Sequence, residues 1–328
     1  MTRVAFLSGD PGGPSARHRI GLLLPALAAR GVEGELRAYP RGWFARRRLY
    51  RELAAADVVL VQRRLPNVAE IAKLRAAAKK LVFDFDDALP FHVSTRGAGE
   101  SSMRAGRFGA MVTAADLVVA GSEVLAELAR ERGAERVRVI PTVPDLARIA
   151  PRDVPDDLGD ALPVIGFVGS AATLPYLASI RSALGPLAGR ARLTIVADEA
   201  IEVGKLEVEL DRWSEATEAA SLARFDVGLA PLTDDPWARG KCGLRVLQYA
   251  AAGVACVASP IGAQAEIVAD GETGFHARTT AEWTGRIERL IADAPLRRRL
   301  GAAARARAEA EYSPERRGGE LADAIEEA

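Results

Sequence analysis

Short runs of apolar residues alternate with longer stretches of helical character along this chain, and that alternation limits the folds open to it. In the first half the apolar runs lie at residues 3–8, 34–39, 57–61, 81–85, 116–120 and 136–140. Between them the residue pattern predicts helices at 15–30, 44–54, 66–79, 103–114 and 122–133. Continuous apolar strands separated by helices are typical of a parallel sheet that is covered on both faces. We therefore expect an α/β fold.

A proline-rich stretch at residues 141–163 interrupts the alternation. It also carries an acidic cluster formed by Asp153, Asp156, Asp157 and Asp160. Proline fixes φ and ends helices, so this stretch is interpreted as a linker. Strands then follow at 164–168, 192–196, 226–230 and 254–258, with helices at 173–187, 214–223, 241–252, 280–293 and 295–311. A chain of 328 residues suits about two domains. We expect tandem Rossmann-like domains at 1–150 and 151–312, and an amphipathic helix at 313–328 that could pack back toward the first domain.

The composition argues against several classes of protein function. Lysine plus arginine and aspartate plus glutamate both number 44, so the chain lacks the basic excess of a nucleic-acid-binding protein. Hydrophobic residues make up 49% of the chain, which argues against disorder, and no uninterrupted apolar window is long enough to span a membrane. The first residues look like a buried strand and not a signal peptide. Two cysteines form neither a disulfide framework nor a metal set. These features predict a cytoplasmic protein without a nucleic-acid partner.

Glycine-rich loops follow the first predicted strand of each half. In open α/β sheets, ligands bind at the carboxyl ends of the strands. Gly12 and Gly13 lie in the first loop, where glycines let a ligand approach the backbone and a helix start favours an anion. The spacing does not match the dinucleotide fingerprint. Gly169 and Ser170 lie in the corresponding loop of the second half. Each loop is open to two interpretations, a phosphate site or an ordinary turn and helix cap.

Three carboxylates, Asp84, Asp86 and Asp87, lie at the end of the fourth predicted strand. Strand alternation puts Asp84 and Asp86 on the same side, and buried carboxylates are costly unless they are paired or used. Three interpretations remain open: a divalent-metal site, contact with a hydroxyl-rich substrate with one carboxylate as a base, or salt bridges to Arg17, Arg19 or other nearby arginines. We favour substrate contact over the metal. His92, in the loop that follows, is a further candidate.

The most specific pattern runs from Gly240 to Pro260. If a helix starts at Lys241, then Lys241, Arg245 and Gln248 fall within a narrow arc of its surface. Two stacked cations repel each other, and a diphosphate would relieve that repulsion. Gln248 can both donate and accept, which suits ribose hydroxyls. The alternative is a solvated basic face. Glu266, in the first turn of a short helix, is either a sugar contact or a helix-start acid.

A basic helix near residue 44 combines arginines with aromatic residues. Arg46, Arg47 and Arg48 lie beside Trp43 and Phe44, and Arg41 precedes them. A solvated basic face would explain this pattern. Contact with an anionic lipid surface is the other interpretation, and it would make the protein peripheral to a membrane.

The stretch 240–275, together with Trp283, residues 300–301 and residues 311–313, resembles retaining nucleotide-sugar glycosyltransferases of the GT-B fold. Glycosyltransferase family 4 is the most similar class. The first half is similar through its glycine-rich loop, Arg19, Asp84–Asp87 and residues 115–117, 121–123 and 140–142. The resemblance implies two Rossmann-like domains that face a central cleft, the first binding the acceptor and the second the donor. It also implies transfer with retention, without a cofactor and usually without a metal.

The resemblance implies a role for each candidate residue. Lys241 and Arg245 would stabilise charge on the leaving diphosphate, and Asp86 would orient the acceptor hydroxyl. The implied donor-binding residues are Gly12, Gly13, Gly169, Ser170, Gln248 and Glu266. The implied acceptor-binding residues are Asp84, Asp87, His92 and Arg19. The family's paired glutamates fall on Gly240 and Gln248, so both are replaced.

The expected partners are a nucleotide-sugar donor and a glycan, lipid or small-molecule acceptor. Two alternatives stay open at this point. One is a GT-B nucleotide-sugar epimerase. The other is a non-catalytic module that binds sugar nucleotides or glycans.

Overall fold

The structure is a computed structural model that describes residues 1–152 and 161–328. Its contacts divide the chain into two units. The first unit comprises Met1–Val143, Arg239–Cys242 and Ser313–Ala328, and the second comprises Pro144–Ala238 and Gly243–Tyr312. The division after Val143 precedes the expected boundary at residue 150. The reason is that Ile149 is already buried in the core of the second unit, whereas Val143 packs in the core of the first. Residues 153–160 of the expected linker lie outside the described part.

The first unit contains a six-stranded parallel sheet in the order β2-β1-β3-β4-β5-β6. The strands are β1 (Thr2–Ser8), β2 (Val32–Ala38), β3 (Val58–Gln62), β4 (Lys80–Phe85), β5 (Leu117–Ala120) and β6 (Val137–Val139). The six strands predicted for this half are confirmed. The central strands β3, β4 and β5 are buried along almost their whole length, as the apolar runs indicated.

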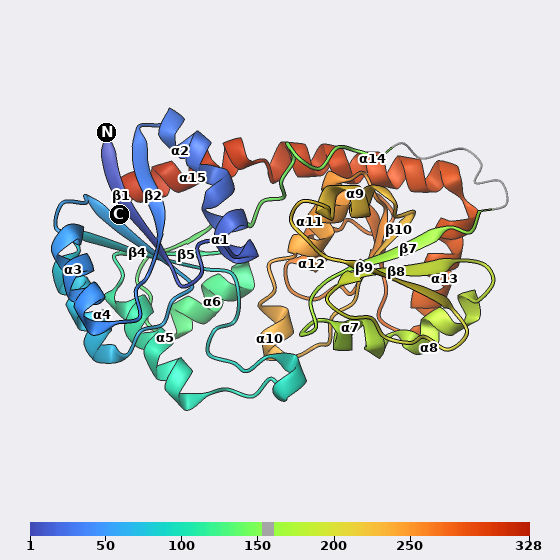
Figure 1. Ribbon diagram of the computed structural model, residues 1–328, viewed down its shortest axis with the longest axis horizontal. Coiled ribbons are helices and arrows are strands. Elements are labelled where there is room, and N and C mark those ends of the chain that lie inside the picture. The colour runs from blue at the N-terminus through green and yellow to red at the C-terminus, as the bar shows by residue number, and fades with distance from the viewer. Residues whose placement is uncertain (153–160) are drawn as a thin grey trace. The chain divides into compact units, whose positions relative to one another are not determined.

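Helices cover both faces of the first sheet (Figure 1). They are α1 (Pro14–Arg19), α2 (Leu24–Ala29), α3 (Trp43–Leu53), α4 (Val68–Ala77), α5 (Ser102–Ala114), α6 (Glu123–Glu131) and α15 (Pro314–Glu327), with 3₁₀ turns η1 (Gly21–Leu23) and η2 (Ser94–Arg96). The helix expected at 15–30 is broken. Ile20 leaves the helical region at φ −129°, and Pro25 starts a new helix because its ring suits only the first turn.

Helix α15 belongs to the first unit, where it lies along α2 (Figure 1). A Cβ at Gly318 would stand 2.5 Å from the Cβ of Ala26, so glycine permits the close approach of the two helices. Leu321 and Ile325 are buried in the core of this unit. The tail is thus held by apolar packing.

The second unit contains another six-stranded parallel sheet, in the order β12-β11-β10-β7-β8-β9. The strands are β7 (Val164–Val168), β8 (Arg192–Ala197), β9 (Glu207–Arg212), β10 (Val227–Ala230), β11 (Cys256–Ala258) and β12 (Gly274–His276). Four of these were predicted. The sequence pattern missed β9 because it is a mostly polar edge strand, and β12 because it has three residues.

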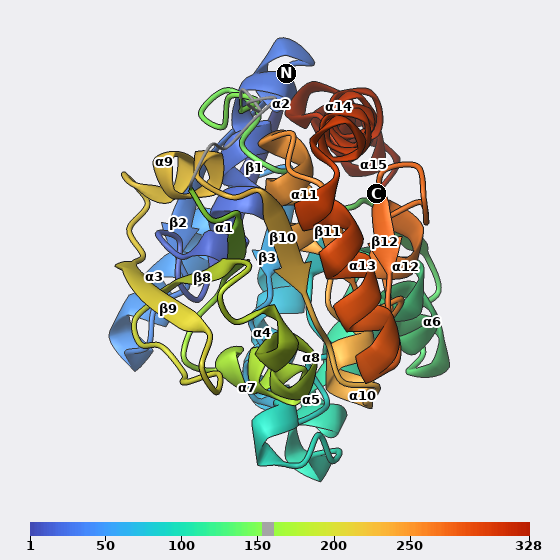
Figure 2. The ribbon, with the colours of Figure 1, turned by 90° about the vertical axis from the view of Figure 1, so that its right-hand side faces the viewer.

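The helices of the second unit are mostly short. They are α7 (Leu174–Ser179), α8 (Arg181–Leu184), α9 (Glu218–Ala223), α10 (Pro236–Arg239), α11 (Leu244–Ala251), α12 (Gln264–Ile267), α13 (Thr280–Ala292) and α14 (Ala294–Glu311), with the 3₁₀ turn η3 (Gly185–Leu187). Figure 2 shows α13 against the sheet, where it contacts β10 and β11. The expected α/β class, with two parallel sheets, is confirmed. Whether the sheets face a common cleft stays a prediction. Among the helices of the described residues, none is long and apolar enough to cross a membrane.

Candidate functional site

Asp84, near the end of β4, forms a buried ion pair with Arg19 of α1. Their side chains are 1% and 2% exposed. The Nε of Arg19 donates to Oδ2 of Asp84 at 3.3 Å, a second guanidinium nitrogen donates to Oδ1, and a third donates to the carbonyl of Ile140. Burial raises the pKa of Asp84 above its ordinary value, although Arg19 opposes the shift. The pair fixes α1 against β4. Contact of either side chain with an acceptor stays a prediction.

Asp86 is held by a chain of hydrogen bonds at the carboxyl ends of three adjacent strands. Ser8 donates to Gln62 at 2.8 Å, Gln62 donates to Ser15 at 2.7 Å, and Ser15 donates to Oδ2 of Asp86 at 2.6 Å. The other oxygen, Oδ1, makes no hydrogen bond among the described residues. The nearest cationic group is the guanidinium of Arg63, at 3.6 Å. Oδ1 is therefore a buried oxygen whose charge is opposed by Arg63.

Asp87 is buried and pairs with two cations, Arg63 and Lys241. The Nζ of Lys241 lies 2.8 Å from Oδ1 of Asp87. Arg63 has a φ of +55°, in the left-handed region that non-glycine residues seldom adopt. Such strain is retained at functional sites more often than elsewhere. The sequence analysis missed Arg63, although its position directly after β3 was a usable signal.

Lys241 belongs to the segment Arg239–Cys242, which fits closely within the first unit. A Cβ at Gly240 would stand 2.6 Å from the Cβ of Ala88, and a Cβ at Gly121 would stand 2.4 Å from the Sγ of Cys242. The thiol of Cys242 donates to the carbonyl of Asp86 at 3.2 Å. Burial raises the pKa of this thiol, so it stays protonated and is no nucleophile. These contacts fix the backbone that carries Lys241.

The expected common helical face of Lys241, Arg245 and Gln248 is wrong. Helix α11 begins at Leu244, and Gly243 precedes it with a φ of +70°. Lys241 therefore lies before the helix. The turn at Gly243 uses a conformation that glycine adopts without strain, and sequence periodicity does not reveal it.

Arg245, in the first turn of α11, lies at the carboxyl end of β7. Its guanidinium stands over the ring of Phe167, 4.2 Å from the centroid, and its Nε donates to the carbonyl of Val168 at 2.6 Å. No carboxylate pairs with Arg245 among the described residues. Burial lowers its pKa, which is the sign of a desolvated cation without a counter-charge. An anion at this place would supply that charge.

Gln248, one turn further along α11, is buried and donates to Glu218 of α9 at 2.8 Å. Glu218 also accepts from the indole of Trp213 at 3.0 Å. The sequence analysis missed Glu218, because an acid at the start of a helix is common. Glu266 lies exposed on α12.

The two glycine-rich loops differ in how their backbone groups are used. The amide of Gly169 donates to Val196, and that of Ser170 donates to Thr173 at 2.9 Å, so both are already engaged. In the first unit Gly12 is exposed, with nothing within 4 Å of a Cβ placed on it. A Cβ on Gly13 would meet Oδ2 of Asp10 at 2.5 Å.

His92 is half-buried in the loop after β4, and its amide donates to the carbonyl of Gly99. The donor and acceptor roles given to the loop glycines and to this histidine stay predictions. In the part of the chain that is described, no three histidine, cysteine or carboxylate side chains come together in a metal-binding group.

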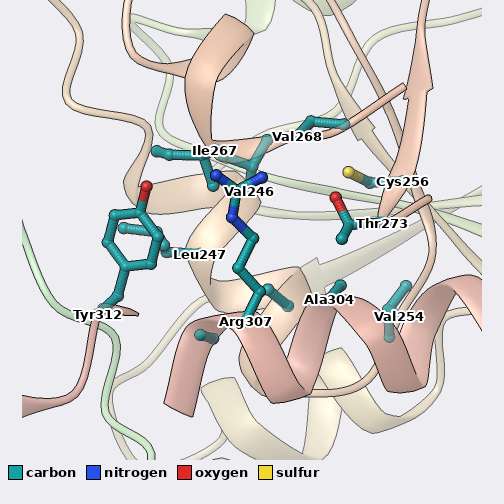
Figure 3. A pocket seen from close by; sticks show the side chains of 12 residues that line it. Val246, Leu247, Val254, Cys256, Ile267, Val268, Thr273, Ala304, Arg307 and Tyr312 are labelled. Carbon is teal, nitrogen blue, oxygen red and sulfur yellow. The ribbon is translucent and has the colours of Figure 1, made fainter. Parts of the chain in front are cut away.

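A small cavity lies within the second unit, in a different place from Arg245 (Figure 3). It measures about 10 Å³, enough for about one water molecule. Apolar residues of α11, α12 and α14 line most of it, with Arg307, Tyr312 and Thr273 at its edge. A void of this size cannot hold a nucleotide sugar, so it reflects imperfect packing of α14 on α11.

Comparisons with known proteins bear on the fold and on the second unit. Residues 162–293 match the family model of the glycosyl transferases group 1. No curated protein sequence matches the chain. Several solved structures match the chain over almost its whole length. Because their sequence identity is low, this similarity shows a shared fold and no more.

Sucrose-phosphate synthase from Thermosynechococcus elongatus has a TM-score of 0.76 at 17% identity, covering 100% of this chain and 99% of that one. HepE from Anabaena in complex with UDP and glucose has a TM-score of 0.71 at 17% identity, covering 100% of both chains. A glycosyltransferase from Rickettsia africae has a TM-score of 0.72 at 14% identity, covering 99% of this chain and 98% of that one.

Proposed function

We propose that this chain, whose residues 162–293 match the family model of the glycosyl transferases group 1, is a GT-B glycosyltransferase that moves a sugar from a nucleotide-diphosphate sugar to a hydroxyl acceptor. The observation that carries the proposal is the state of Arg245. Its guanidinium is stacked on Phe167, donates to the carbonyl of Val168 and has no carboxylate partner among the described residues. A diphosphate is the anion that such a donor would carry, and a guanidinium can bind it with paired hydrogen bonds.

The proposed reaction keeps the configuration at the anomeric carbon. The bond from that carbon to the diphosphate oxygen breaks, and a bond to the acceptor oxygen forms on the same face. The proton of the acceptor hydroxyl passes to the leaving diphosphate, so no separate base is needed. Negative charge develops on the diphosphate as the bond breaks, and a positioned cation lowers the barrier most at that point. Arg245 would supply this cation, and no metal ion would be required.

The first unit supplies the proposed acceptor groups. Asp86, whose Oδ2 is fixed by Ser15 and whose Oδ1 lies 3.6 Å from Arg63, would orient the acceptor hydroxyl. Asp87 holds Lys241 and Arg63 in place, so these cations keep a defined geometry. Lys241 would supply a further cation for the diphosphate. In the second unit, Gln248 would contact the ribose and Glu266 the transferred sugar.

The first test is binding of UDP, chosen because HepE was solved in complex with UDP and with UDP-glucose. Thermal shift and calorimetry would compare the unmodified protein with Arg245→Met. The matched control is Arg289→Met, since Arg289 also stands over a phenylalanine ring, at 5.1 Å from Phe275. We expect Arg245→Met to weaken UDP binding by about 10- to 100-fold, the range for a lost charge-assisted contact, and the control to bind normally. Equal binding by both variants would overturn the role of Arg245.

A second test separates the classes of function. The protein would be incubated with UDP-, GDP- and TDP-sugars, with and without hydroxyl acceptors, in buffer containing a chelator. Acceptor-dependent release of the nucleoside diphosphate supports the proposal, and NMR of the product reports the anomeric configuration. An epimerised donor formed without acceptor would instead establish an epimerase. Tight binding with no turnover across the acceptor panel would establish a binding module.

A further inference from the structure

Helix α3 exposes two adjacent aromatic side chains to solvent. Trp43 is 55% exposed and Phe44 is 81% exposed. Their rings meet edge to face with centroids 4.7 Å apart. The other large hydrophobic residues that are exposed in the described chain, Met1, Val68, Met103 and Leu210, are not neighbours in sequence. An exposed aromatic pair is costly in water and typically marks a surface that contacts something else.

Three arginines of the same segment have no carboxylate partner among the described residues. Arg41, Arg47 and Arg51 are exposed, and no described carboxylate pairs with any of them. The guanidinium of Arg47 lies over the Trp43 ring at 5.8 Å. Trp43, Arg47 and Arg51 are four residues apart along the helix, so they form one stripe on its surface. Aromatic and cationic groups are therefore combined on a single exposed face.

The opposite side of α3 is firmly anchored, so the exposed face is a rigid one. Tyr50 donates to Glu70 of α4 at 2.6 Å, and Arg46 forms an ion pair with the same carboxylate at 3.6 Å. Leu49 and Leu53 are buried in the first unit. Arg48 forms an ion pair with Glu52 at 2.8 Å, so its charge is already compensated.

Helix stability does not explain why arginines gather at the start of α3. The first turn contains no acid, and Arg41 lies directly before the N-cap Gly42. Cations near a helix N-terminus are unfavourable because they oppose the helix dipole. The positive charge is also local, since the whole chain has equal numbers of acids and bases. Phosphate groups near this helix would relieve both the dipole mismatch and the repulsion among the arginines.

We propose that this face of α3 docks on an anionic phospholipid surface. Trp43 and Phe44 enter the headgroup region, where their rings leave water, and Arg41, Arg47 and Arg51 pair with lipid phosphates. A lipid surface fits better than a nucleic acid or an acidic protein. It offers an apolar layer for the Phe44 ring together with a plane of phosphates, and a neutral chain lacks the charge to bind a soluble polyanion. The inference does not depend on sugar transfer.

The test is co-sedimentation of the full chain with vesicles, without any sugar donor. Vesicles of phosphatidylcholine would be compared with vesicles that also contain phosphatidylglycerol, at low and at raised salt. We expect binding to the anionic vesicles only, weakened by salt. Each arginine near such a surface contributes about a fivefold factor in affinity. Arg47→Gln/Arg51→Gln should therefore bind about 25-fold more weakly. Arg181→Gln/Arg299→Gln, which removes two exposed arginines of the second unit, should bind normally.

Fluorescence gives an independent readout, because Trp43 is the exposed tryptophan while Trp237 and Trp283 are buried and Trp213 is half-buried. We expect a blue shift on anionic vesicles that is lost in Trp43→Phe, and weaker binding by Phe44→Ser but not by the control Leu210→Ser. Equal binding to neutral vesicles would overturn the proposal. Unchanged vesicle binding by the double-arginine variant would also overturn it. The same holds if the protein binds heparin, heparin prevents its binding to the vesicles, and the fluorescence of Trp43 does not shift.

Discussion

The ammonium group of Lys241 lies 2.8 Å from Oδ1 of Asp87, a residue that precedes it by 154 positions. Arg63 contacts the other oxygen of the same carboxylate. Two cations therefore share one buried acid, and Arg63 also lies 3.6 Å from Asp86. This arrangement keeps Lys241 in a defined position.

Replacement of Lys241 tests whether its charge acts on the substrate. We expect Lys241→Ala to lower the turnover by about 100-fold, the usual effect of removing one group that stabilises developing charge. Stability should change little, because Arg63 still neutralises Asp87. Release of nucleoside diphosphate gives the rate, and Lys205→Ala, an exposed lysine of the second unit, is the control. Near-normal turnover would reduce Lys241 to a structural partner of Asp87.

The close approach of Gly121 to Cys242 predicts a steric coupling. Gly121→Ala places a methyl group 2.4 Å from the Sγ of Cys242, and such overpacking costs about 1–3 kcal/mol of unfolding free energy. Adding Cys242→Ala removes the sulfur and should recover most of this loss. Urea denaturation of the four proteins of the double-mutant cycle measures the coupling. Gly109→Ala is the control, since its nearest atom stands at 3.9 Å. Additive effects of the two substitutions would refute the contact.

The buried pair of Arg19 and Asp84 predicts an unequal response to single and double substitutions. Asp84→Asn leaves the Arg19 charge without compensation and should cost about 3–5 kcal/mol. Arg19→Met/Asp84→Leu removes both charges and should be less destabilising than Asp84→Asn alone. Chemical denaturation checks the order. The exposed pair of Arg30 and Asp323 is the reference, where Asp323→Asn should cost less than about 1 kcal/mol. A small effect of Asp84→Asn would mean that the pair does not stabilise the fold.

The order of strands and helices was predictable because buried parallel strands are continuous apolar runs, as in Val58–Gln62 and Val164–Val168. The polar edge strand Glu207–Arg212 was not predictable, because half of its residues are exposed and its sequence contains no apolar run. The position of the carboxylates at the end of β4 was also predictable, because the apolar run that marks this strand stops there.

The pairing within the candidate site was not predictable, because it depends on local conformation and long-range contacts. The left-handed turn at Gly243 removes Lys241 from the helix on which periodicity placed it. Arg63 reaches Asp86 and Asp87 only because the fold brings the ends of β3 and β4 together. The salt-bridge interpretation named Arg19, which the structure pairs with Asp84, but it did not name Arg63.

Glu70 predicts a pH dependence of stability in the first unit. The hydrogen bond from Tyr50, assisted by Lys73 and Arg46, lowers the pKa of Glu70 below its ordinary value. The folded state therefore favours the ionised carboxylate. Its stabilisation is fully present above the unfolded-state pKa of about 4.3 and is lost as the pH falls through the lower folded-state value. Glu70→Gln should thus cost about 1–3 kcal/mol near neutral pH, the value of hydrogen bonds to a charged group, and progressively less toward about pH 3. Urea denaturation across this range measures the difference, with Glu33→Gln on the exposed edge strand β2 as the control. A difference that stays constant with pH would mean that the contacts of Glu70 do not depend on its charge.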